Sequence, residues 1–394
     1  MRVLCTAWAW PTHVNQMIPL AWALRAAGHQ VGIAVPPPIR DEAAGSGLPV
    51  TAVGTDAGSL ARFQALVAGE HTGPAGPPGV PRSVEIFSGL ADAMADDLLA
   101  HARGWRPDVI ISDPSAYAGM LVGAALGVPV LRHPWFADVM GFLSVKEAVR
   151  AAELAALTPI ADRLGAGSFE LLGTATIDPC PPSMRLPVPG RRQPIRYVPY
   201  HGVHTGDVPK SLLRKGKRPR VCLTWGTTVG RIDPARVPLA RLAAALASAG
   251  MEPVVAVAAD QAGLLGPMPG GVVVAESVRL SELLASCDVV VGHGGAGTIM
   301  SGLLNGLPQL AVPLLPDHRF NTGRLVASGA GLSIEAPEAT GDAVLDAVRE
   351  LLEDGAYRAR AGELAAEIEA QPSPAEVAAG FAGLVLDQEP LVVS

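Results

Sequence analysis

The chain has 394 residues, of which 49% are hydrophobic and 17% are charged. A composition this apolar supports a large core and excludes a chain that is disordered throughout, and the length predicts two domains at roughly 150 residues each, with three as the alternative. A net charge of −7 without a long basic stripe excludes a nucleic-acid-binding protein.

The first segment, Val3–Thr6, is a short apolar run that predicts a buried strand. The N-terminal stretch MRVLCTAWAWP resembles a secretory signal peptide, but its apolar run is short, its basic region is a single arginine and Pro11 interrupts it, so we expect a strand. Four cysteines are scattered without paired spacing: Cys5, Cys180, Cys222 and Cys287. This cysteine pattern indicates a reducing environment, and we expect a cytoplasmic protein.

Strand-like and helix-like segments alternate through the first half of the chain. Helices are expected at Met17–Ala27, Glu85–Ala102 and Ala116–Leu126, and strands at Gln30–Val35, Asp108–Ser112 and Pro129–Arg132. Short apolar strands separated by helices predict a parallel sheet with helices on both faces. Gly54–Arg82 has no sustained period, so we expect a long functional loop there, which could form a lid.

The alternation restarts after Pro181–Pro219, a segment dense in proline and basic residues that marks a linker. Strands are expected at Arg220–Thr224, Pro253–Ala258, Gly271–Ala275, Val289–Val291 and Gln309–Leu314, with helices at Leu239–Ala249, Leu280–Ala285, Thr298–Leu304 and Asn321–Ser328, and a last helix from Pro374. Val289–Pro316 has no charged residue, but its glycines, prolines and polar residues favour strand–turn–helix–strand over a membrane span.

Two α/β halves of similar size predict two Rossmann-like β/α/β domains that face a cleft. The expected boundaries are an N-terminal acceptor-binding domain at 1–195, a linker at 196–219 and a C-terminal domain at 220–371. A C-terminal helix at 372–394 is expected to pack back toward the N-terminal domain.

The sequence VVVGHGGAGTIM at 289–300 places His293 in a glycine-rich turn between a strand and a helix. In open α/β sheets, ligands bind at the carboxyl ends of strands, and a helix N-terminus there attracts anions. Gly295 and Gly297 let the main chain approach a phosphate, and Thr298 can donate a hydrogen bond. A charge-assisted bond from His293 would add about 1.5–3 kcal/mol. The pattern favours a nucleoside diphosphate whose charge grows as it leaves.

The same turn has other interpretations. Gly292-x-Gly294-x-x-Gly297 matches a dinucleotide fingerprint, and Asp317 follows about 20 residues later, as an NAD(P)-dependent oxidoreductase would require. However, no equivalent motif follows the first strand, and His293 would crowd a dinucleotide. A third interpretation is a turn that only permits close packing of helix on strand, with His293 capping the helix.

A second histidine, His13, follows the first strand in the loop before a helix. An unperturbed histidine pKa near 6.5 suits proton removal at neutral pH, so His13 is a candidate general base. Trp8 and Trp10 alternate along the end of the strand, and Trp135 adds a further ring in this half. These aromatic side chains are expected to line a pocket for a hydrophobic acceptor.

With these residues, the chain resembles GT-B-fold glycosyltransferases of family 1, and more closely the bacterial enzymes that attach deoxysugars to antibiotic aglycones. The resemblance covers nearly the whole chain. It depends on the His13 loop with Pro19-Leu20, Ser112-Asp113, Tyr197-Val198-Pro199-Tyr200, Leu223–Thr227, His293–Thr298, and Pro313 with Asp317.

The resemblance implies an inverting transfer from a nucleotide-sugar, expected to be a dTDP-sugar with a UDP-sugar as the alternative, to a hydrophobic natural-product aglycone such as a polyketide. His13 would deprotonate the acceptor hydroxyl, and Asp113 would orient His13. The implied donor-binding residues are Thr227, Glu276, Ser277, Val278, His293, Gly295, Gly297, Thr298, Asp317 and His318. The resemblance implies no obligatory metal and no other cofactor.

Two departures from the family pattern leave alternatives open. Asp317-His318 stands where many relatives have Asp-Gln, which leaves the identity of the sugar open, with a dideoxysugar as one alternative. Asp138 stands where a subgroup that acts on aromatic polyketides carries an acidic residue, which would make a C-glycosyltransferase. His201 and His204 have metal-like spacing but lack a third ligand nearby. A catalytically silent binding protein, the assembly state (including a homodimer) and the need for an auxiliary protein also stay open.

Overall fold

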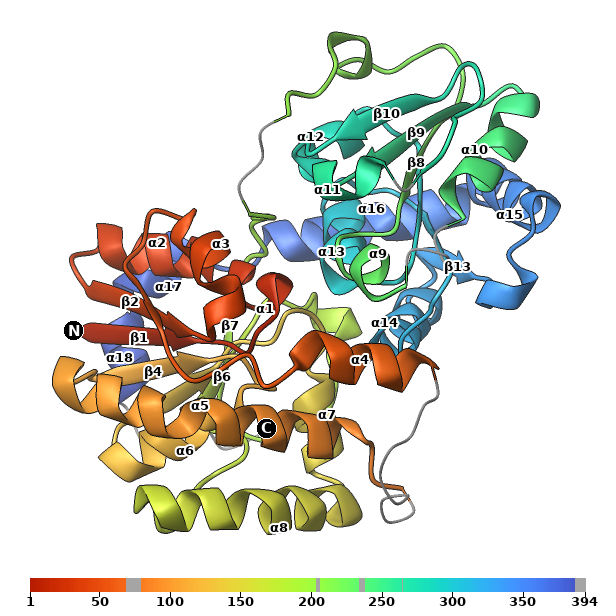
Figure 1. Ribbon diagram of the computed structural model, residues 1–394. Helices are drawn as coiled ribbons and strands as arrows, with labels where there is room; N and C mark the ends of the chain where they lie inside the picture. The colour runs from red at the N-terminus through yellow and green to blue at the C-terminus, as the bar shows by residue number, and fades with distance from the viewer. Residues whose placement is uncertain (69–78, 203–205, 234–237, 264, 387–394) are drawn as a thin grey trace. The chain divides into compact units, whose positions relative to one another are not determined.

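A computed structural model describes residues 1–68, 79–202, 206–233, 238–263 and 265–386, and it divides into two units (Figure 1). The first unit comprises Met1–Cys180, Arg185–Val203 and Gln371–Ser394, and the second comprises Pro181–Met184 and His204–Ala370. The chain therefore returns to the first unit at its C-terminal end.

The first unit is built on a seven-stranded sheet in which every pair of neighbouring strands is parallel, in the order β3-β2-β1-β4-β5-β6-β7. The strands are β1 (Arg2–Thr6), β2 (Gln30–Val35), β3 (Val50–Ala52), β4 (Val109–Ser112), β5 (Val130–Arg132), β6 (Ala175–Asp178) and β7 (Arg192–Pro194). Thr6 at the end of β1 pairs with Ser112 at the end of β4. The carboxyl ends of these two strands therefore meet at one edge of the sheet.

Helices cover both faces of this sheet, as the alternating pattern predicts (Figure 1). They are α1 (Pro11–Asn15), α2 (Ile18–Ala26), α3 (Arg40–Ala44), α4 (Ser59–Ala68), α5 (Ser83–Trp105), α6 (Tyr117–Leu126), α7 (Val139–Ser144), α8 (Glu147–Leu164), α17 (Pro374–Ala379) and α18 (Phe381–Leu386). The helices α5, α6 and α8 pack together, and α17 packs against α2. Leu24, Ile33 and Phe381 share one buried core, so the C-terminal segment contributes directly to the first unit.

Three expectations for this unit were incomplete. The segment Gly54–Arg82 contains the helix α4, whose apolar residues the flanking Gly and Pro obscure; residues 69–78, where the loop was expected to continue, lie outside the described residues. The helix α8 was missed because it is rich in alanine, lacks a strong apolar period and contains Pro159. The strand β7 lies in the segment predicted as a linker, where Pro194 is tolerated because the strand is at an edge.

The second unit is built on a six-stranded sheet in the order β10-β9-β8-β11-β12-β13, again with every neighbouring pair parallel. Its strands are β8 (Arg220–Thr224), β9 (Glu252–Val257), β10 (Val273–Glu276), β11 (Val289–Gly292), β12 (Gln309–Ala311) and β13 (Gly331–Ser333). Its helices are α9 (Thr228–Ile232), α10 (Leu239–Ser248), α11 (Ala259–Ala262), α12 (Leu280–Leu284), α13 (Ala296–Leu304), α14 (Pro316–Ala327), α15 (Gly341–Glu353) and α16 (Gly355–Glu369). Short 3₁₀ helices complete the chain at Pro37–Ile39, Pro182–Met184, Lys210–Leu212 and Ala336–Glu338.

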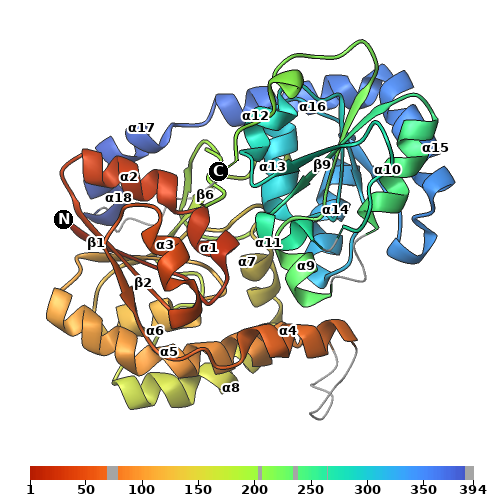
Figure 2. The ribbon, with the colours of Figure 1, turned by 45° about the horizontal axis from the view of Figure 1, so that its top comes forward.

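The run of valines in β11 is explained by helices on both faces of the second sheet (Figure 2). Val289 and Val291 pack with α10 and α15, whereas Val290 faces the opposite core with α12. A central parallel strand is buried on both sides and therefore reads as a continuous apolar run.

Among the described residues, the structure has no helix that is both long and apolar enough to span a bilayer.

Candidate active site

The carboxyl edge of the first sheet brings His13 and Asp113 together. The chain leaves β1 and enters α1, which carries His13, while Asp113 directly follows β4. Their side chains are in contact, with His13 Nδ1 2.6 Å from Asp113 Oδ2. The sequence predicted this pair from residues 100 positions apart, and the parallel pairing of β1 with β4 accounts for the contact.

The arrangement of groups around His13 determines its useful nitrogen. Asp113 is fully buried and its carboxylate can only accept, so Nδ1–H donates to it. Trp8 Nε1 lies 3.1 Å from the same Nδ1. With Nδ1 held by Asp113, Nε2 is the ring nitrogen that can take a proton from a substrate.

A third residue, Ser115, completes this corner and was missed by the sequence analysis. Its main-chain N–H donates to Asp113 Oδ1 at 2.8 Å, and its hydroxyl donates to the same oxygen. The only signal in the sequence is the Asp-Pro-Ser turn that follows a strand, which is common in turns that have no chemical role.

Aromatic side chains surround His13. The ring centroid of Trp8 lies 5.4 Å from that of Trp10 and 5.1 Å from that of Phe63, and Trp135 lies 4.3 Å from His13. Phe87 adds an edge contact to Trp8. Phe63 and Phe87 were not predicted, because they lie on α4 and α5, far from the strand ends in the sequence. The cluster presents apolar ring surface beside a potential base.

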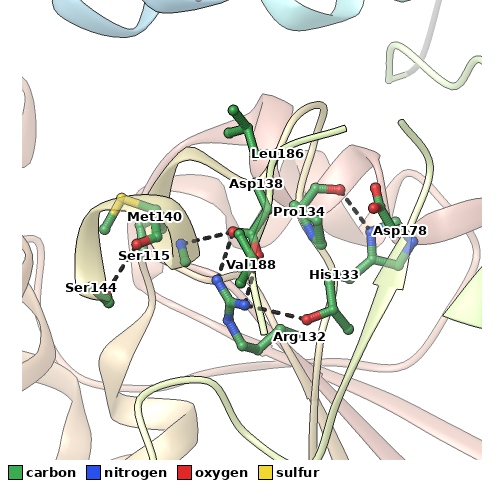
Figure 3. Close-up of polar contacts among 12 residues, drawn as sticks. Ser115, Arg132, His133, Pro134, Asp138, Met140, Ser144, Asp178, Leu186 and Val188 are labelled. Atoms are coloured by element: carbon green, nitrogen blue, oxygen red, sulfur yellow. Dashed lines mark hydrogen bonds and ion pairs between the residues drawn. The ribbon is translucent and has the colours of Figure 1, made fainter. Parts of the chain in front are cut away.

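Asp138, the alternative base, is held in a buried ion pair. Arg132 donates to both carboxylate oxygens at 2.7 Å, and the main-chain N–H of Gly141 donates to Oδ1 at 2.9 Å, so Asp138 caps α7 (Figure 3). Both charged side chains are almost completely buried. A carboxylate whose two oxygens accept these three hydrogen bonds is poorly placed to take a substrate proton. The geometry therefore argues against a C-glycosyltransferase that uses Asp138 as its base.

In the second unit, the turn after β11 places glycines where other residues would not fit. Gly294 has a φ of +82°, and a Cβ there would lie 2.5 Å from Thr322 Oγ1. Gly295 is the N-cap of α13 and offers no side-chain cap, so the first N–H groups of the helix, including those near Gly297 and Thr298, are not capped by it. Such an end is suited to bind a phosphate.

His293 is buried at this turn as a neutral imidazole. Burial, with a smaller contribution from the neighbouring His318, lowers its pKa to about 3, although Asp317 and a backbone hydrogen bond with Thr224 act in the opposite direction. The expected charge-assisted bond is therefore not available to the unliganded protein, and His293 offers a neutral donor or acceptor. Its Nδ1 is one of three buried polar atoms without a hydrogen-bond partner around this edge, together with Trp225 Nε1 and Thr322 Oγ1.

The predicted donor-binding residues at and after the end of β10 differ in how exposed their side chains are. Glu276 is exposed at the end of the strand, whereas the side chain of Val278 is buried in the core, which leaves only its main chain for a ligand. Ser277 adopts a φ of +49°, and its hydroxyl accepts a hydrogen bond from the main chain of Ala259. Thr227 occupies the N-cap position of α9, after β8, but its side chain makes no capping hydrogen bond.

Asp317 and His318, at the start of α14, also differ in how exposed their side chains are. Asp317 lies in the first helical turn with a half-exposed side chain, whereas His318 is buried. His318 Nδ1 accepts the main-chain N–H of Leu315, and its ring packs edge-on against His293 at 4.6 Å. Asp317 is thus the exposed member of the pair, whereas His318 packs on His293 inside the core, and the contacts of the two residues with the sugar stay predictions.

Within the part of the chain that the structure describes, no three His, Cys, Asp or Glu side chains are grouped so that they could hold a metal ion. His204, one half of the metal-like histidine pair, lies outside the described residues.

Comparison with known proteins identifies relatives along the whole chain. The N-terminal and C-terminal domain models of the erythromycin biosynthesis protein CIII-like family match residues 80–226 and 240–384. Tylactone mycaminosyltransferase of Streptomyces fradiae is 38% identical over 95% of this chain and 90% of its own length. The structure of glycosyltransferase VinC in complex with dTDP is similar at a TM-score of 0.81 and 31% identity, covering 98% and 99% of the two chains. Spinosyn rhamnosyltransferase SpnG, complexed with thymidine diphosphate, gives a TM-score of 0.80 at 29% identity, with 97% and 100% covered.

These likenesses, with two Rossmann-like parallel sheets, define the class of protein: the chain is a glycosyltransferase of the GT-B fold. It belongs to the erythromycin biosynthesis protein CIII-like family, within the family 1 antibiotic deoxysugar glycosyltransferases expected from the sequence. The NAD(P)-dependent oxidoreductase alternative for Gly292–Gly297 is therefore wrong. The fingerprint also follows β11, the fourth strand of its unit in chain order, and not the first.

Proposed function

We propose that the chain transfers a deoxysugar from a dTDP-sugar to a hydroxyl group of a hydrophobic natural-product aglycone, with inversion at the anomeric carbon. The observation that carries the proposal is the contact of His13 with buried Asp113 inside an aromatic cluster. The relatives support the substrate classes: one is named tylactone mycaminosyltransferase, and two structures hold thymidine diphosphate.

The proposed chemistry is a direct displacement. His13 Nε2 takes the proton of the acceptor hydroxyl while its oxygen attacks the anomeric carbon, and the bond from that carbon to the diphosphate oxygen breaks. Asp113 stabilises the imidazolium that forms. The leaving diphosphate carries the negative charge away, which the N-terminus of α13 would stabilise.

On this proposal, the second unit binds the donor through the turn after β11. The main-chain N–H groups of Gly295, Gly297 and Thr298 would hold the diphosphate, and a ligand oxygen or hydroxyl would give His293 Nδ1 the partner that it lacks. Contacts are also proposed from Thr227, from Glu276, Ser277 and the main chain of Val278 to the base and ribose, and from Asp317 to the sugar. Trp8, Trp10 and Trp135 would contact the acceptor.

The experiment that tests the base is substitution of His13. His13→Ala is expected to lower kcat by roughly 10²–10⁴, because one general base contributes about that much, while dTDP still binds. Turnover is followed as release of dTDP from the donor, and donor binding is followed by the shift in Tm on adding dTDP. His101→Ala, a partly exposed histidine on α5, is the control and should keep full activity. Full activity in His13→Ala would overturn the proposal.

The nucleotide is tested by thermal melting with dTDP, UDP and NAD⁺ in parallel. A ligand at about 100 times its Kd adds about 2.7 kcal/mol, which raises Tm by several degrees. We expect the largest shift with dTDP, and a smaller dTDP shift in Thr298→Val, which removes the hydroxyl in the first turn of α13. A larger shift with UDP than with dTDP would contradict the proposed donor.

A further inference from the structure

Ser115 holds the side chain of Asp113 through the carboxylate oxygen that His13 does not contact. Both donors of Ser115, its main-chain N–H and its hydroxyl, are directed at Oδ1, while His13 occupies Oδ2. Ser115 is 1% exposed and Asp113 is 0% exposed, so water does not compete for these hydrogen bonds. The two carboxylate oxygens therefore have separate partners.

The main chain around Asp113 is equally constrained. Its N–H donates to Thr6 O at 3.0 Å, which continues the pairing of β1 with β4, and its carbonyl accepts the N–H of Ala116 at 3.0 Å. With the backbone held in this way, rotation about the side-chain torsions is the freedom that remains to the carboxylate. The donors of Ser115 restrict that rotation. The hydroxyl of Ser115 also lies 3.5 Å from His13 Nδ1, so the side chains of Ser115, Asp113 and His13 pack against one another.

We propose that Ser115 is a positioning residue for sugar transfer: by occupying Asp113 Oδ1 with two donors, it keeps Oδ2 directed at His13. The inference rests on the proposed function of His13 and Asp113. A carboxylate stabilises the imidazolium formed during proton transfer only when it is held in line with Nδ1–H. Ser115 acts on the reaction through Asp113 and is not placed in contact with either substrate.

The chain supplies a matched control in Ser112. It is the last residue of β4, where the loop to Ser115 begins, is also a fully buried serine, and its hydroxyl donates to main-chain carbonyls of Asp113 and Ala116 at 3.1 Å. Ser112 does not reach the carboxylate of Asp113. Comparison of Ser115→Ala with Ser112→Ala therefore separates the loss of a buried hydroxyl in this loop from the loss of a donor to the carboxylate.

The first experiment compares steady-state kinetics of the two variants with the unaltered enzyme. Ser115→Ala is expected to lower kcat about tenfold, since a hydrogen bond to a charged group is lost, with KM for donor and acceptor within about twofold. Ser112→Ala should keep kcat within about twofold. Ser115→Thr, which retains the hydroxyl, should recover most of the kcat. Equal kcat values for Ser115→Ala and Ser112→Ala would overturn the inference.

A double-mutant cycle with Asp113→Asn shows whether Ser115 acts through the carboxylate. If it does, adding Ser115→Ala to Asp113→Asn changes kcat by less than about twofold, because the group that Ser115 orients has already lost its charge. A further tenfold loss in the double variant would overturn the inference. The activity of His13→Ala shows which proposal has failed. If His13→Ala is inactive but Ser115→Ala acts independently of Asp113, only the role of Ser115 is contradicted. If His13→Ala is active, the proposed function is contradicted as well.

Discussion

Three buried histidines of this enzyme are held neutral by their surroundings. Burial lowers the pKa of His133 to about 4 and those of His293 and His318 to about 3. Each ring lies at a strand end or in the first turn of a helix. His318 Nδ1 acts as a neutral acceptor toward the main chain of Leu315, whereas His293 Nδ1 has no partner. The histidines that the sequence singles out therefore differ: His13 is partly exposed beside a carboxylate, and His293 is enclosed.

These depressed values predict an acid-dependent loss of stability. Between about pH 3 and 6.5, the unfolded chain binds a proton at His318 and the folded protein does not, so stability rises with pH there. The contribution is fully present above the unfolded pKa and is lost as the pH falls toward 3. His318→Gln, whose amide can accept the Leu315 hydrogen bond, should lower the pH slope of the unfolding free energy by about 1 kcal/mol per pH unit.

The measurement is urea unfolding of both proteins at about pH 5 and about pH 6. Two carboxyls act in the opposite sense, because burial raises the pKa of Glu153 and of Asp178, so the folded state takes up their protons first. The difference between variant and unaltered protein removes these shared contributions. His101→Gln, at a partly exposed position, is the control and should change the slope less. Identical slopes for His318→Gln and the unaltered protein would show that His318 titrates normally.

At the scale of single elements, the start of α7 depends on the ion pair of Asp138 with Arg132. The ion pair joins the end of β5 to the start of α7. Trp135, whose ring contacts His13, lies in the segment between them. Glu153 on α8 accepts hydrogen bonds from Tyr117 and Ser144 in the same interior. The polar interior under α7 thus supports the aromatic surface at the proposed base.

Asp138→Asn is expected to destabilise the protein by about 3–5 kcal/mol, because it leaves the Arg132 charge buried without its counterion. The free energy is obtained from urea unfolding followed by tryptophan fluorescence. Asp92→Asn is the control: it breaks an ion pair with Arg163 in which both side chains are about half exposed, and such pairs contribute about 0–1 kcal/mol. Equal losses in the two variants would contradict a buried structural role for Asp138.

At the scale of the whole molecule, the last helices belong to the first unit although the second unit precedes them in the chain. Phe381 on α18 is completely buried in the core formed by β1, β2 and α2, while Leu386 at the end of α18 is 71% exposed. The segment that follows the second unit therefore completes the core of the first, so the first unit cannot complete its packing before the residues of the second unit have been made.

Phe381→Ala should destabilise the first unit by about 3–5 kcal/mol, the usual cost of removing a buried aromatic ring. Leu386→Ala, at the exposed end of the same helix, should change stability by less than about 0.5 kcal/mol. Tryptophan fluorescence during urea unfolding is a suitable readout, since five of the six tryptophans lie in the first unit and only Trp225 lies in the second. If Phe381→Ala unfolded at the same urea concentration as Leu386→Ala, the C-terminal helices would not be part of that core.

The sequence by itself determined the class of fold and most of its elements, because short apolar strands and amphipathic helices carry their periodicity locally. The strands Gln30–Val35 and Arg220–Thr224 were predicted to the residue, and β11 to within one. Family motifs marked His13, Asp113 and His293 as candidate site residues for the same reason, since each lies after a recognisable strand.

Tertiary structure alone decided what those side chains do, since contacts between distant segments leave no local pattern. Phe63 joins the aromatic cluster from a helix hidden in a Gly- and Pro-rich segment, and Ser115 reaches Asp113 through a turn of ordinary composition. The carboxylate of Asp138 forms a buried ion pair with Arg132, and burial keeps the imidazole of His293 neutral. Burial and the partner of each polar atom depend on the packed chain as a whole, which is why the residue types were readable from the sequence and their roles were not.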